Sequence, residues 1–128
     1  MTQTDVPQTR LWRSRRPVAL GAVMAIFRRG CGDPTFRATA DGSVLMGVRT
    51  PAGPASLLLR PHARESAVEA TACGPGAAWS LARVPDLLGD ADDDAGFAPH
   101  HPLVAEARRR FPGWRVPRSG LVLDALVP

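Results

Sequence analysis

Hydrophobic and polar residues alternate through the middle of this chain. Four segments show either a two-residue alternation or a short apolar run: residues 35–40, 43–49, 56–60 and 66–72. Asp41 and Gly42, between the first two segments, are a strong signal for a tight hairpin. The prolines of residues 51–54 mark the next turn, because proline does not fit inside a central strand. The pattern predicts four consecutive antiparallel strands. Their expected core residues include Phe36, Val44, Met46 and Val48.

Helical spacing of apolar residues appears on both sides of these strands. It predicts helices over residues 21–29, 77–84 and 102–110, and a fourth that starts at Ser119 with a serine cap. The inward-facing residues are expected to be Val23, Ile26 and Phe27 in the first helix, Trp79 and Ala82 in the second, and Leu103, Val104 and Ala107 in the third. A short strand is predicted over residues 17–20, before the first helix.

The order of these elements predicts an α+β fold. About five strands form a small antiparallel sheet with two covering helices, followed by the truncated start of an all-helical domain. The division of the chain follows from the same pattern. Residues 1–16 are expected to be a disordered basic lead-in, residues 17–89 the α+β domain, and residues 90–128 a linker with the first helices of the helical domain.

The C-terminal segment, residues 120–128, is unusually apolar. Burying its large aliphatic side chains would contribute roughly 8–15 kcal/mol, about the net stability of a whole domain. Those side chains are Leu121, Val122, Leu123, Leu126 and Val127. The helix predicted at 102–110 offers too little apolar surface to cover them. We therefore expect an exposed apolar patch at this end.

Composition limits the class of protein. The chain has 128 residues, 45% of them hydrophobic, which fits one domain with a small core. It contains no apolar run of the ~18 residues needed to cross a bilayer and no signal-peptide pattern, so a cytoplasmic protein is expected. Cys31 and Cys73 match no metal-binding spacing and are expected to be reduced thiols.

The charge favours an anionic partner, because the net charge is +4 and the isoelectric point is about 10.8. All 16 basic residues are arginine, and the chain has no lysine, asparagine or tyrosine. This bias indicates a GC-rich genome. The arginines are therefore not by themselves a sign of selection for phosphate binding.

Several side chains are compatible with chemistry, but each also has a plainer interpretation. His100 and His101 could bind a metal, or they could form a solvated helix start. Asp92, Asp93 and Asp94 could bind Mg²⁺ or act as acid and base, or they could form a solvated loop that caps the next helix. Cys31 has no histidine placed by sequence to activate it as a nucleophile. Arg108–Arg110 could grip phosphates, or they could be a solvated helix end.

Three stretches carry a family resemblance: GDPTFRATADGSV at 32–44, GPGAAWSLARVPDLLG at 74–89, and GFAPHHPLVAEARRRFPGWRVPRSGLVLDALVP at 96–128. They resemble the N-terminal part of actinobacterial DNA-3-methyladenine glycosylases of type II. The resemblance covers about residues 12–128. It is most specific in the last stretch, where order, spacing and residue type match over more than thirty positions.

The resemblance implies a fold and a chemistry. In this family a small antiparallel sheet with two helices precedes an all-helical catalytic domain, which flips the alkylated base into a pocket. A helix-hairpin-helix with a glycine-rich hairpin holds the DNA backbone, and an aspartate beyond it assists cleavage. Neither is found in these 128 residues. Asp124 precedes the motif and does not take the catalytic role.

The sequence thus predicts an N-terminal fragment of a base-excision glycosylase, inactive alone, from a truncated or frameshifted gene or a split enzyme. No catalytic residue, metal ligand or cofactor is assigned, and no DNA-contacting residue is specified. The expected partners are DNA, bound weakly and without sequence preference, and a separately encoded catalytic half; no membrane is expected. The alternative is a stand-alone arginine-rich module that binds nucleic acid. A third interpretation is a complete small enzyme that uses Asp92, Asp93 and Asp94.

Overall fold

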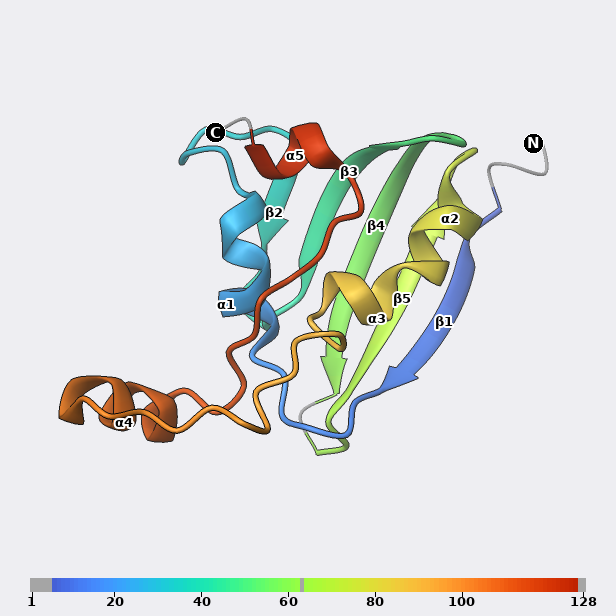
Figure 1. Ribbon diagram of the computed structural model, residues 1–128. Helices are drawn as coiled ribbons and strands as arrows, with labels where there is room; N and C mark the ends of the chain where they lie inside the picture. Colours follow the sequence, from blue (N-terminus) through green and yellow to red (C-terminus); the bar gives the residue numbers. More distant parts are fainter. Residues whose placement is uncertain (1–5, 63, 127–128) are drawn as a thin grey trace.

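A five-stranded antiparallel sheet forms the centre of the protein. The computed structural model describes residues 6–62 and 64–126. The strands lie in the order β1-β5-β4-β3-β2 (Figure 1). Their bounds are β1 Gln8–Arg13, β2 Phe36–Ala38, β3 Val44–Thr50, β4 Gly53–His62 and β5 Ala67–Cys73. Strands β2 to β5 are joined as consecutive hairpins, so the predicted α+β class and its antiparallel sheet are confirmed.

The two-residue alternation decides which side of each strand is buried. Val44 and Met46 are buried, whereas Leu45 between them faces the other side of the sheet. Phe36 and Val48 are half-buried, as expected for residues nearer the edge. The same alternation continues in β4, where Leu57 and Leu59 enter the core. The predicted hairpin at Asp41 and Gly42 is confirmed: Gly42 has a φ of 84° and connects β2 to β3.

The first strand corrects the expectation that residues 1–16 are disordered. Gln8–Arg13 forms β1 and pairs with β5, and Trp12 opposite Val68 is only 8% exposed. Residues 1–5 lie outside the described residues. The pattern of apolar residues does not predict β1, because an edge strand with one open face carries few of them. The strand predicted at 17–20 is wrong, because Pro17 to Ala19 are irregular and a helix begins at Leu20.

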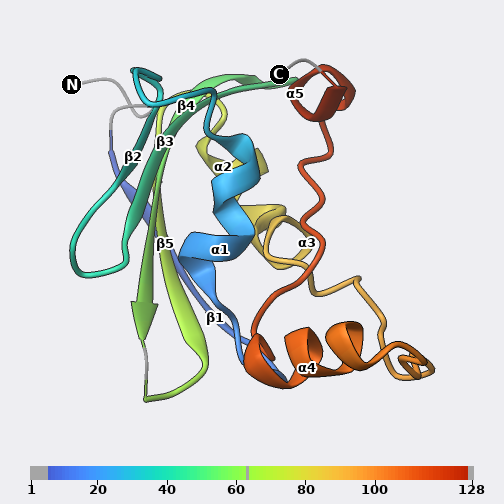
Figure 2. The ribbon, with the colours of Figure 1, turned by 90° about the vertical axis from the view of Figure 1, so that its left-hand side faces the viewer.

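Short helices cover one face of the sheet and leave the other face open (Figure 2). They are α1 Leu20–Met24, the 3₁₀ turn η2 Ala25–Phe27, α2 Ala77–Ala82 and α3 Val84–Leu87. Val23 is buried and Phe27 packs against the core, but Ile26 is 64% exposed. The 3₁₀ turn changes the helical phase after Met24 and moves Ile26 outward, so its predicted inward position is wrong.

The face of α2 also differs from the prediction. Ala77, Leu81 and Val84 point into the core at helical spacing, whereas Trp79 is half-buried and Ala82 is exposed. Gly76 determines this phase. A Cβ at Gly76 would lie 2.4 Å from the Thr50 hydroxyl, so the start of α2 sits directly on the β3–β4 turn.

The C-terminal part of the chain runs along the helix-bearing side. Helix α4, Pro102–Arg110, projects from the body (Figures 1 and 2). Leu103, Val104 and Ala107 are exposed, so their predicted inward orientation is wrong. Residues 111–118 then return to the body, and α5, Val122–Leu126, lies at the other end near α1 and β2 (Figure 1). Helices α4 and α5 are therefore too far apart to cover one another.

Candidate interaction surfaces

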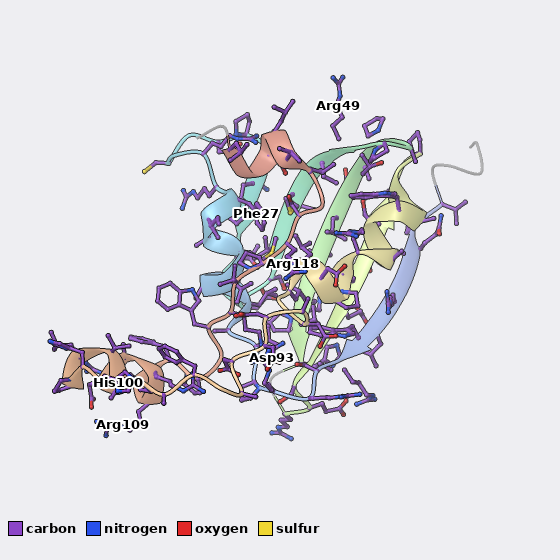
Figure 3. The ribbon with its side chains drawn as sticks, viewed as in Figure 1. Phe27, Arg49, Asp93, His100, Arg109 and Arg118 are labelled. Carbon is purple, nitrogen blue, oxygen red and sulfur yellow. The ribbon has the colours of Figure 1, made fainter. Side chains whose placement is uncertain are left out.

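Of the paired histidines, His101 caps the start of α4. The Nδ1 atom of His101 accepts a hydrogen bond of 3.2 Å from the Leu103 backbone N–H, as a helix cap does. His100 is exposed at the outer end of the molecule (Figure 3). Within residues 6–62 and 64–126, no three side chains of His, Cys, Asp or Glu are grouped to hold a metal ion.

The acidic loop joins distant parts of the chain. Asp94 pairs with Arg16 at 2.9 Å and with Arg108 at 3.1 Å. Arg16 also donates to the backbone carbonyl of Asp92. The Asp92 carboxylate accepts a hydrogen bond of 2.9 Å from the Val116 N–H. These contacts pair Asp94 with two arginines and connect α4 and the returning segment to the body.

Arg115 lies beneath this loop and is 5% exposed. Its Nη2 atom donates to the Ser14 hydroxyl at 2.7 Å and to the carbonyls of Arg16 and Pro17 at 2.7 and 2.9 Å. Burial lowers the pKa of the guanidinium, and the charge of Arg16 lowers it further. Arg115 fixes the returning segment against the start of α1, and sequence patterning gave no signal for it.

A backbone contact strengthens this attachment. The Ala19 N–H donates to the Gly113 carbonyl at 2.9 Å, and a Cβ at Gly113 would lie 2.7 Å from the Ala19 nitrogen. Residues 111–118 are thus packed closely on the body. The expected division at residue 90 separates parts of the chain that are in direct contact.

Helix α5 is held mainly by two contacts. Asp124 pairs with Arg29 at 2.7 Å, and Leu121 lines a small cavity with Phe27 and Met46. The Ser119 hydroxyl accepts a hydrogen bond of 3.0 Å from the Leu121 N–H just before the helix. Asp124 therefore joins α5 to the loop after η2.

A broad apolar flank lies on the helix-bearing side. It comprises the exposed large hydrophobic residues of η2, α4, α5 and the segments next to them: Ile26, Phe97, Leu103, Val104, Phe111, Trp114, Val116, Val122, Leu123 and Leu126. A groove beside α4 is lined by Val104, Phe111, Trp114 and Val116. The apolar residues around this groove form a surface of the kind that marks an interaction site, and those of α5 form a second exposed patch at the other end of the flank. The expected patch at residues 120–128 is confirmed for Val122, Leu123 and Leu126. It is wrong for Leu121, which is half-buried beside the cavity that Phe27 and Met46 also line. Val127 lies outside the described residues.

The open face of the sheet has a different character. Its outward positions carry Arg13, Arg37, Arg49 and Arg60 around Leu45 and Leu58. Arg13 pairs with Glu65 at 2.8 Å, and Arg60 is 3.5 Å from Glu69. Among the described residues, no carboxylate lies within 4.0 Å of Arg37 or Arg49. Each arginine occupies a polar position of the strand alternation, which is the signal that could have identified this face.

The basic end of α4 is more fully compensated. Arg108 pairs with Asp94 and lies 5.2 Å from the centre of the Phe97 ring, and Arg109 pairs with Glu106. Arg109 lies far from the sheet (Figure 3). Two of the three arginines considered as candidate phosphate ligands are therefore already engaged with carboxylates.

In the part of the chain that the structure describes, no helix is long and apolar enough to cross a bilayer. Cys31 is exposed, Cys73 is half-buried, and both are free thiols. No family model, curated protein or solved structure matches this chain.

Proposed function

We propose that this chain is the sheet-containing part of a DNA glycosylase that removes alkylated bases of the 3-methyladenine type. The observation that carries the proposal is the resemblance of residues 96–128 to that family over more than thirty positions. The architecture supports it, because the family places a small antiparallel sheet with helices before its catalytic domain, and this chain has such a sheet. In this proposal the protein acts on DNA in the cytoplasm.

The apolar flank gives the proposal a physical basis. Fully burying large aliphatic or aromatic side chains contributes roughly 1.5–3 kcal/mol each, so the flank is a costly surface to leave in water. A helix-rich catalytic portion would cover it. Trp114 and Leu123, 63% and 75% exposed, are the strongest candidates for anchors of that interface.

Base excision needs a pocket for the flipped nucleotide and a group that assists cleavage of the glycosidic bond. The candidate acids of this chain have other contacts. Asp124 pairs with Arg29, Asp94 with two arginines, and Asp92 accepts a backbone N–H. The proposal therefore assigns the chemistry to the helical portion and gives this chain a structural and docking role, with no activity of its own.

The test is a chimaera in which this chain replaces the sheet domain of an actinobacterial 3-methyladenine glycosylase. Release of 3-methyladenine from alkylated duplex DNA is measured by chromatography for the chimaera, the helical domain alone and this chain alone. We expect the chimaera to exceed the helical domain alone, and this chain to match the uncatalysed background. Multiple-turnover release by this chain alone, or a chimaera no better than the helical domain, would overturn the proposal.

Paired variants localise the interface. Trp114→Asp with Leu123→Asp places charges on the apolar flank and should lower release by the chimaera at least tenfold. Val6→Asp places a charge on an exposed residue before β1, outside the apolar flank, and should leave release unchanged. If the two variants behave alike, the flank is not the interface and this part of the proposal is wrong.

A further inference from the structure

Most carboxylates of this chain lie on the helix-bearing side of the sheet, together with many of its arginines. Seven of the 12 acidic residues lie between residues 86 and 124, on the helix-bearing side, where arginines bind several of them. The open face carries four arginines, with Glu69 on the same face and Glu65 in the adjoining turn. The outward strand positions of the open face therefore carry four arginines and one carboxylate, Glu69.

We infer that the open face of the sheet, through Arg37, Arg49 and Arg60, binds the phosphate backbone of duplex DNA. The inference deepens the proposed function, because it names the surface by which the sheet-containing part contacts the DNA. The support for the inference is the placement of the arginines, and this placement holds whether or not the proposed function is correct.

Strand register places Arg37 and Arg60 two strands apart on this face. Arg37 on β2 is opposite Leu45, and Leu45 is opposite Leu58 on β4, two residues before Arg60. Neighbouring strands lie about 4.8 Å apart, so Arg37 and Arg60 are separated by about 10 Å across the sheet. A major groove is about 12 Å wide. The side chains can thus reach phosphates of more than one nucleotide.

Exposure leaves these side chains available. Arg49 extends beyond the end of β3 into solvent (Figure 3), and Arg37 is exposed on the short strand β2. Arg60 is exposed, and among the described residues its one carboxylate partner within 4.0 Å is the half-buried Glu69, at 3.5 Å. A surface pair of this kind contributes about 1 kcal/mol or less, so a phosphate can replace the glutamate at little cost.

The composition of the face favours duplex over single-stranded nucleic acid. Sheets that bind single strands stack the bases on aromatic side chains. Trp12 and Phe36 belong to the core side, and the centre of the open face is formed by Leu45, Leu58 and Thr71. Contacts to phosphate without base stacking imply weak binding with no sequence preference and a steep dependence on salt.

The experiment measures binding of the full chain to a fluorescent 20-base-pair duplex by anisotropy at several salt concentrations. The test variant combines Arg37→Gln, Arg49→Gln and Arg60→Gln. The matched control combines Arg108→Gln, Arg109→Gln and Arg110→Gln, which removes the same charge from α4. Urea midpoints of both variants, measured first, show whether each still folds.

We expect the affinity of the test variant to fall at least tenfold at 50 mM salt. Its slope of log affinity against log salt should fall by about 3, because each phosphate that is no longer neutralised lowers the slope by about 1. The control should keep the wild-type slope within 1. An equal fall in affinity for the two variants, or a larger fall for the control, would overturn the inference.

Two further probes complete the test. A 20-nucleotide single strand that binds more tightly than the duplex would contradict the choice of duplex. If the wild-type chain binds anionic vesicles but does not bind the duplex, the open face contacts a lipid surface and the inference is refuted. If the open face does not bind DNA, the base release expected of the chimaera does not change. Failure of this inference can therefore be distinguished from failure of the proposed function.

Discussion

Trp12 offers the sharpest test of the fold, because sequence pattern and structure disagree about its surroundings. The pattern places it in a disordered lead-in, whereas the structure places it in β1 opposite Val68, with 8% of its surface exposed. Its neighbour Leu11 lies on the other side of the same strand and is 46% exposed. The two residues are a matched pair on opposite faces.

The expected magnitude follows from burial. A buried tryptophan removes about 150–250 Å² from water, and replacing one by alanine costs about 3–5 kcal/mol. Domains of this size have a net stability of about 5–15 kcal/mol, so Trp12→Ala should remove a large part of it. Leu11→Ala should cost about 1 kcal/mol or less, because much of that side chain is already in water.

Urea denaturation followed by circular dichroism measures both variants. We expect a large fall in the midpoint for Trp12→Ala, with little change in slope, and a small fall for Leu11→Ala. If both variants lowered the free energy of unfolding by less than about 1 kcal/mol, β1 would not be part of the cooperative sheet. The pairing of β1 with β5 would then be refuted.

Three further predictions concern the glycine beneath Arg115, the C-terminal helix and the loop before β2. Gly89→Ala should lower the free energy of unfolding, measured in a thermal melt, by about 1–3 kcal/mol. The reason is that Gly89 has a φ of +79° and that a Cβ there would lie 2.6 Å from the Arg115 Cβ. The control is Gly96→Ala, because a Cβ at Gly96 would meet open space. Deleting residues 119–128 should reduce self-association in sedimentation and leave the melting temperature nearly unchanged, because α5 leaves most of its large apolar side chains exposed; an unfolded product would contradict this. Hydrogen bonds from Arg29 and Thr35 lower the pKa of Asp33 from 3.8 to about 2, so its stabilising effect is complete above pH 4 and lost as pH falls through 2. The difference in urea midpoint between wild type and Asp33→Asn should therefore shrink over that range, and a constant difference would refute the assignment.

Part of the candidate surface could be predicted from the chain alone. Arg37 and Arg49 occupy the polar positions of their strands, so alternation already placed them opposite the core. The apolar residues of α5 were expected to remain exposed, and Val122, Leu123 and Leu126 do so. The position of Arg115 could not be predicted. A buried arginine depends on acceptors from Ser14, Arg16 and Pro17, about 100 residues earlier in the chain.

The sequence by itself determined the hairpins, because alternation and turn residues act over a few positions. The pattern from Phe36 to Val48 predicts two strands with a tight turn, and the structure has them. The tertiary structure decided which elements meet. Trp12 is ordered because β5 supplies hydrogen bonds 56 residues later, opposite Val68. Leu103 is exposed because α4 projects from the body, although its own spacing fits a buried face. Local periodicity reports which side of an element can be buried, whereas long-range packing decides whether another element is there to bury it.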